Sequence, residues 1–135
     1  MGPRLGIDIA GGAERAWLEL VDLDRWPAWG PSVRAARLDD GTRRLKAGAT
    51  GSVRTPVGAW VGFRVTDWHD TGSRRSWSWE VLGVPATAHT VTATGPGRCR
   101  VEIAVPWWAP AYLPVVGVGL RRIRARVETG DAEVG

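Results

Sequence analysis

The chain of 135 residues is long enough for one domain with a substantial apolar core, and its 44% hydrophobic content excludes a disordered chain. Its net charge of +4 comes from arginines that occur in pairs spread along the sequence, which argues against the concentrated basic face of a nucleic-acid-binding protein. The single cysteine, Cys99, excludes an internal disulfide and a thiolate zinc site, and its apolar neighbours predict a small buried side chain.

A short strand and two small helices are predicted for the beginning of the chain. Apolar residues alternate from Leu5 to Ala10, which is typical of a strand. From Ala13 to Val21 they recur at helical spacing instead. Asp22 can cap a second short helix, which Pro27 and Pro31 are expected to end because proline breaks helices.

Six further strands, separated by turns rich in glycine and proline, predict an antiparallel meander. The expected strands are Val33 to Leu38, Ala49 to Thr55, Ala59 to Trp68, Arg75 to Leu82, Ala86 to Thr94 and Arg98 to Val105. Together with the opening strand they make a sheet of seven. A tight turn at 95–97 would pair residue 93 with residue 99, and would therefore place His89 opposite Ile103.

The last element is predicted to be a long amphipathic helix. Its apolar positions are three and four residues apart and form one stripe, namely Leu113, Val116, Leu120, Ile123 and Val127. Gly117 and Gly119 cost about 1 kcal/mol each in a helix interior, relative to alanine. This helix must therefore recover stability by packing against the sheet, or must need a close approach or a bend at the glycines. The residues after Thr129 are expected to form a flexible tail.

Strand parity places one histidine among apolar residues. The last strand turns one apolar face inward, formed by Cys99, Val101, Ile103 and Val105. In the register above, His89 lies on the same inward face, beside Ile103. If it is buried without an acidic partner, its pKa should fall and the side chain should stay neutral. His89 is thus either a structural side chain, hydrogen-bonded inside the core, or the best polar candidate for a functional site.

Nine tryptophans are the most unusual feature of the composition. Trp77 and Trp79 alternate with polar residues and should face inward, but a two-residue turn before Ala86 would place Trp79 opposite Ala88. Either a bulge lies in this hairpin or the register is shifted by one residue, which would reverse the two faces. On the strand expected at 59–68, the inward set is Val61, Phe63 and Val65, which leaves Trp60, Arg64 and Trp68 on the other face.

The order of the elements resembles that of the START-like or SRPBCC superfamily, which includes polyketide cyclase/dehydrase-like proteins and lipid-transfer domains. Short segments are similar too, namely Ala13-Glu14-Arg15-Ala16-Trp17, Trp26 to Val33, Gly48-Ala49-Thr50-Gly51, Trp77-Ser78-Trp79, His89 and Gly97 to Val101. The resemblance implies a single domain over residues 1–135, with a core of about 5–127. It implies an α+β helix-grip fold, in which a seven-stranded curved antiparallel sheet, two short helices and a long C-terminal helix enclose a cavity. It also implies a hydrophobic ligand, whereas only some branches are enzymes.

We expect aromatic and aliphatic side chains from several elements to bind the ligand: Trp26, Trp29, Phe63, Trp77, Trp79, His89, Ile103, Trp107, Tyr112, Val116 and Leu120. The first functional hypothesis is binding of a lipid-like, polyketide or other aromatic molecule in this cavity. The second is an enzyme of the cyclase/dehydrase type, with His89 as general base and Tyr112 or Arg54 as the partner of an oxyanion.

A third hypothesis is association with a membrane surface. The uncharged segment from Val105 to Leu120 is too short and too often interrupted by proline to span a bilayer, but its aromatic residues and the arginines that follow could anchor it at an interface. An exposed Trp107-Trp108 pair would favour a homodimer. The sequence carries no metal triad and no phosphate-binding loop, so neither metal nor cofactor is expected. It shows no export signal, so we expect a cytoplasmic protein.

Overall fold

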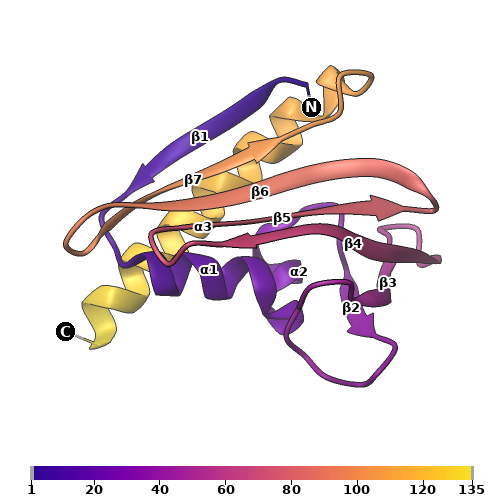
Figure 1. Cartoon of the computed structure of the whole chain (residues 1–135), viewed down its shortest axis with the longest axis horizontal. Coiled ribbons are helices and arrows are strands. Elements are labelled where there is room, and N and C mark those ends of the chain that lie inside the picture. Colours follow the sequence, from indigo (N-terminus) through magenta and orange to yellow (C-terminus); the bar gives the residue numbers. More distant parts are fainter. Residues whose placement is uncertain (1, 135) are drawn as a thin grey trace.

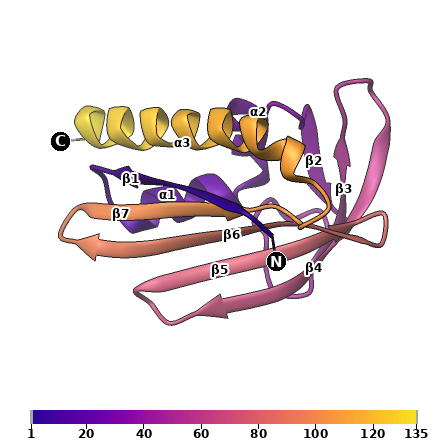
Figure 2. The same ribbon diagram turned by 90° about the horizontal axis from the view of Figure 1, so that it is seen from above.

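The computed structural model describes the backbone of residues 2–134 and the side chains of residues 2–130, and within them a curved seven-stranded sheet forms one layer and a long C-terminal helix the other (Figures 1 and 2). The strands are β1 (Arg4–Ile9), β2 (Ala35–Leu38), β3 (Thr50–Arg54), β4 (Trp60–Asp70), β5 (Arg74–Val81), β6 (Val84–Gly95) and β7 (Arg98–Ala104). Their order in the sheet is β1-β7-β6-β5-β4-β3-β2, and each neighbouring pair is antiparallel. This arrangement confirms the predicted helix-grip fold.

The helices of the described chain follow the predicted order. They are α1 (Ala13–Val21), the 3₁₀ helix η1 (Leu23–Arg25), α2 (Trp26–Trp29), the 3₁₀ helix η2 (Pro110–Tyr112) and α3 (Leu113–Val134). The side chain of Asp22 accepts a hydrogen bond from the backbone N–H of Asp24 at 3.0 Å, so the predicted cap is present. The expectation that Pro27 ends this helical segment is wrong. Pro27 lies in the first turn of α2, where its missing N–H costs nothing.

Helix α3 packs its apolar stripe against β1, β7 and the two short helices. Val116, Leu120, Ile123 and Val127 are buried, as their spacing predicts. A close approach of α2 explains Gly119, because a β-carbon there would lie 3.4 Å from both the ring and the carbonyl oxygen of Trp29. The helix continues to Val134, so the backbone of residues 129–134 is helical where the sequence predicts a tail. Residue 135 lies outside the described residues.

The hairpins fix which side chains face the helix. In β6–β7, Ala93 pairs with Cys99 and His89 pairs with Ile103, which confirms the predicted register. In β5–β6, the turn consists of Leu82 and Gly83, and both have positive φ. β6 therefore begins at Val84, two residues earlier than expected.

A bulge decides the alternative left open by the sequence for the β5–β6 hairpin. The register shifts between Ser78 and Glu80, so Trp79 lies opposite two residues of β6, Ala86 and Thr87. Trp77 pairs with His89 as a result, and Trp77 and Trp79 both pack into the core on the inner face.

A second bulge corrects one prediction on β4. The register with β5 shifts between Val65 and Asp67, which moves the following residues by one position. Trp68 therefore packs into the core and meets the ring of Trp17 edge-on at 5.4 Å, although the sequence places it on the outer face. Trp60, before the bulge, stays partly exposed.

Candidate ligand-binding site

An aromatic hollow lies between α2, α3 and the inner face of the sheet. Its volume is about 60 Å³, and we call it the inner pocket. It is lined by Trp26, Trp29, Gly30, Pro31, Ser32, Val33, Trp77, Trp79, Thr87, His89, Ile103, Tyr112, Val115, Val116 and Gly119. This volume exceeds what one ordered water needs but is less than half of the roughly 150 Å³ in which a protein cavity binds benzene, so the inner pocket holds only a small group.

A wider hollow adjoins the inner pocket. This outer groove has a volume of about 310 Å³ and runs under the segment that joins β7 to α3. It is lined by Ser32, Val33, Val53, Thr55, Val61, Trp79, Val81, Ala86, Thr87, Pro106, Trp108, Ala109 and Tyr112. Five residues line both hollows: Ser32, Val33, Trp79, Thr87 and Tyr112. Within the described chain, neither lining contains Asp, Glu, Lys or Arg.

Stacked rings form one wall of the inner pocket. The ring of Trp77 lies between those of Trp26 and His89. Its centroid is 5.8 Å from that of Trp26, with the planes 12° from parallel, and 3.9 Å from that of His89, with the planes 25° from parallel. Trp79 meets the edge of Trp77 at 5.6 Å and of Phe63 at 5.2 Å. Both arrangements are favourable geometries for aromatic pairs, so this wall is rigid.

His89 is buried and belongs to a chain of hydrogen bonds behind that wall. Its Nδ1 lies 3.4 Å from the carbonyl oxygen of Trp77, which can only accept, so Nδ1 carries the proton. Nε2 then accepts from the hydroxyl of Thr87 at 3.0 Å, and Thr87 Oγ1 accepts from the indole N–H of Trp79 at 3.0 Å. Burial lowers the pKa of His89 to about 3, so the imidazole is neutral at physiological pH.

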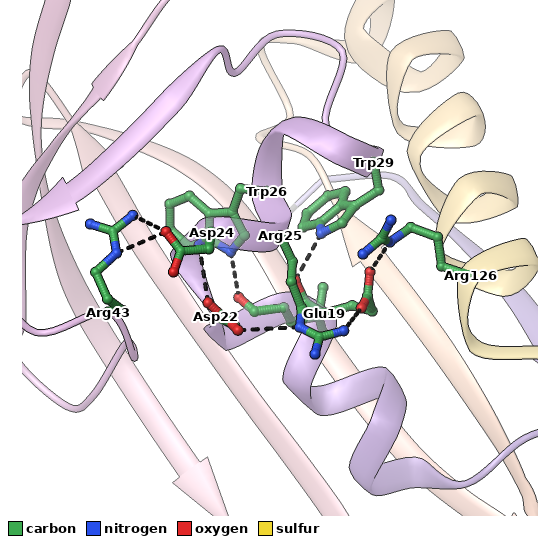
Figure 3. A network of polar contacts seen from close by, with 9 residues as sticks. Glu19, Asp22, Asp24, Arg25, Trp26, Trp29, Arg43 and Arg126 are labelled. Atoms are coloured by element: carbon green, nitrogen blue, oxygen red, sulfur yellow. Dashed lines mark hydrogen bonds and ion pairs between the residues drawn. The ribbon is translucent and has the colours of Figure 1, made fainter. Parts of the chain in front are cut away.

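Two pocket tryptophans are held by carbonyl oxygens of α1 (Figure 3). The indole N–H of Trp26 donates to the carbonyl of Leu20 at 2.9 Å, and that of Trp29 donates to the carbonyl of Glu19 at 2.8 Å. Because these N–H groups are satisfied on the α1 side, neither indole needs a polar partner from a ligand.

The carboxylate of Glu19 joins three helices at the same place (Figure 3). It is buried, and it forms ion pairs with Arg25 of η1 at 2.7 Å and with Arg126 of α3. The hydrogen bond to Glu19 raises the pKa of the Arg25 guanidinium above its usual value. Sequence reasoning missed this network, although Glu19 follows Ala16 by three residues and so shares the buried face of α1.

Eight of the eleven residues expected to bind the ligand line the inner pocket: Trp26, Trp29, Trp77, Trp79, His89, Ile103, Tyr112 and Val116. Phe63 and Leu120 are buried in the adjoining core. Trp107 is 79% exposed and lines neither hollow, and its neighbour Trp108 lines the outer groove. Arg54, considered as an oxyanion partner, is an exposed residue that donates to the carbonyl of Gly58 and also lines neither hollow. Sequence reasoning did not select Ser32, which lines both the inner pocket and the outer groove.

The fold and the hollow under the C-terminal helix define a helix-grip protein of the SRPBCC superfamily. Residues 5–128 match the family described as polyketide cyclase / dehydrase and lipid transport, and the chain belongs to that family. None of the curated proteins matches the chain in sequence.

Solved structures share the fold at low sequence identity. The hypothetical protein jhp0584 from Helicobacter pylori is 15% identical, with a TM-score of 0.74 over 92% of this chain and 86% of that one. XoxI from Bacillus cereus is 16% identical, with a TM-score of 0.63 over 94% of this chain and 96% of that one. A STAR-related lipid transfer protein from Xanthomonas axonopodis is 14% identical, with a TM-score of 0.63 over 92% of this chain and 84% of that one. At these identities the likeness concerns the fold alone.

Proposed function

We propose that the chain binds a small hydrophobic molecule in the inner pocket and the outer groove without transforming it. The observation that carries the proposal is the pair of adjoining hollows, whose described linings are mainly apolar and lack charged side chains. Sites for small molecules are usually concave and apolar, with a few polar groups that fix orientation. The combined space suits an elongated apolar ligand better than either hollow alone.

The cyclase/dehydrase alternative depends on His89 as a general base, and the geometry disfavours it. A general base needs a free lone pair near the substrate and a pKa near the working pH. The lone pair on Nε2 is occupied by the Thr87 hydroxyl, and burial holds the pKa of His89 at about 3. Binding is therefore the function that this site supports best.

Replacing Trp79 with alanine tests the proposal, because Trp79 lines both hollows. We expect the affinity for the neutral dye phenylnaphthylamine, measured by its fluorescence, to fall by about tenfold as an aromatic wall is lost. The matched control is Trp60→Ala, since Trp60 is 40% exposed and lines neither hollow. If the wild-type protein binds no dye, and native mass spectrometry of protein from its own host shows no hydrophobic adduct, the binding proposal is wrong.

A second candidate function is loading of such a ligand at a membrane surface. It is favoured by exposed apolar residues at one end of the sheet, which we call the apolar rim: Val57, Leu82, Val84, Trp107 and Trp108. They belong to the β3–β4 turn, the β5–β6 hairpin and the β7–α3 connection, which lie at the same end of the molecule in Figures 1 and 2. In the described chain no helix is long and apolar enough to cross a bilayer.

Vesicle sedimentation tests the membrane candidate. We expect the wild-type protein to sediment with anionic phospholipid vesicles, and the double substitution Trp107→Ala with Trp108→Ala to reduce the bound fraction several-fold, because exposed tryptophans anchor proteins at the interface. Trp60→Ala again serves as the control. Absence of wild-type sedimentation would exclude the membrane candidate. Analytical ultracentrifugation tests a homodimer instead. If the wild-type protein associates with rising concentration and the double variant stays monomeric, the apolar rim is a dimer interface.

A further inference from the structure

Two hydrogen-bonded pairs of side chains lie at the boundary between the inner pocket and the outer groove. On the helix side, the hydroxyls of Ser32 and Tyr112 are 2.5 Å apart and hydrogen-bonded. On the sheet side, Trp79 donates to Thr87 at 3.0 Å. These four residues and Val33 are the five that line both hollows, and we call them the neck. A ligand with one part in each hollow would contact these residues.

The two sides of the neck differ in what they can offer a ligand. On the sheet side, the N–H of Trp79 is used by Thr87 and the hydroxyl hydrogen of Thr87 is used by His89, so no donor remains. On the helix side, only one of the two hydroxyl hydrogens of Ser32 and Tyr112 can lie between the two oxygens. The other hydrogen is available. The helix side therefore presents one donor at the neck, and its natural partner is an acceptor oxygen.

Charge and size restrict the ligand further. A charged group in either hollow would find no oppositely charged side chain in the described linings, and burying an unpaired charge is costly. The inner pocket has room for only a few atoms, whereas the outer groove is about five times larger and can hold the larger part of a ligand.

We propose that the ligand is an uncharged, mainly apolar molecule whose larger part lies in the outer groove, with a small end at the inner pocket and a carbonyl or ether oxygen at the neck that accepts a hydrogen bond from the Ser32–Tyr112 pair. This inference rests on the binding function proposed above and specifies the ligand class for the same site. Ser32 and Tyr112 are specificity-determining residues in this scheme, because they distinguish a ligand with an oxygen at that position from its hydrocarbon analogue.

Three probes test the inference by displacement of phenylnaphthylamine. Octanophenone has a ketone next to its ring, and octylbenzene has nearly the same shape but lacks the ketone. Benzyldimethylheptylammonium is a similar but bulkier chain with a fixed positive charge one carbon away from the ring. Each is titrated against the wild type, Ser32→Ala, Tyr112→Phe and the double variant. Ser52→Ala, a serine that lines neither hollow, is the matched control. Thermal unfolding of each variant establishes that it is folded.

The readout is the ratio of the octylbenzene Kd to the octanophenone Kd, in which differences in probe hydration cancel between variants. We expect this ratio to fall by about fivefold from the wild type to the double variant, the usual effect of one neutral hydrogen bond. Each single variant keeps one hydroxyl donor, so its Kd ratio should fall less than that of the double variant. An unchanged ratio in the double variant, or tighter binding of the ammonium probe than of the ketone, would overturn the inference while leaving the binding function intact. Failure of all three probes and of the dye to bind would instead contradict the binding function itself.

Discussion

We expect the Trp77→Ala substitution to lower the free energy of unfolding by about 3–5 kcal/mol, the range for removing a fully buried aromatic ring. Trp77 is 1% exposed and is sandwiched between the rings of Trp26 and His89. Removing it leaves a cavity between two rings that are each held by their own hydrogen bonds, Trp26 to Leu20 and His89 to Thr87, so they cannot easily collapse into the space.

Two further variants sharpen this prediction in urea unfolding. Trp60→Ala removes a tryptophan from the outer face instead. Trp60 is 40% exposed, with the guanidinium of Arg37 lying 4.1 Å from its ring centroid, so the variant should cost about 1 kcal/mol or less. Trp77→Phe keeps a stacked ring and removes an indole N–H that has no hydrogen-bond partner in the described structure, so it should retain most of the stability. Equal losses for Trp77→Ala and Trp60→Ala would show that the stacked wall is not the centre of the core.

The sequence predicts the fold well because its strongest signals are local. The Gly95-Pro96-Gly97 segment marks the turn between β6 and β7, and together with a register shift between Gly95 and Ala93 it places His89 opposite Ile103. The apolar spacing of the C-terminal helix predicts which side chains it buries. Both signals depend on a short stretch of chain whose geometry is set by its own residues.

What the sequence does not reveal depends on contacts between distant segments. A bulge adds one residue without a distinctive pattern, so the inward position of Trp68 could not be derived from alternation alone. Glu19 is a charged residue that is buried only because Arg25 and Arg126 arrive from other helices. Ser32 and Tyr112 are eighty residues apart, and their pairing exists only once α3 lies across the sheet. Sequence reasoning therefore located most of the pocket wall and missed the neck that divides the pocket from the groove.

The second large effect expected is a loss of stability on acidification that originates from His89. In the folded protein its pKa is about 3, because burial disfavours the charged imidazolium, whereas the ordinary value is 6.5. Between these two values the unfolded chain binds a proton that the folded chain does not bind. Acid therefore stabilises the unfolded state, and the free energy of unfolding falls as the pH drops below about 6.5. At 1.36 kcal/mol per pH unit, the loss between about pH 7 and pH 5 is about 2 kcal/mol from this residue alone.

Urea unfolding at both pH values, compared between the wild type and His89→Asn, measures this contribution. Asparagine can still donate to the carbonyl of Trp77 but cannot take up a proton, so the variant should be less stable at neutral pH and should lose about 2 kcal/mol less on acidification than the wild type. His69→Asn is the matched control, because His69 is exposed at the end of β4 and should leave the acid response unchanged. If His89→Asn and the wild type lost the same stability between the two pH values, His89 would have to accept a proton inside the folded protein. Its Nε2 would then be available to a bound molecule, and the catalytic hypothesis would regain its general base.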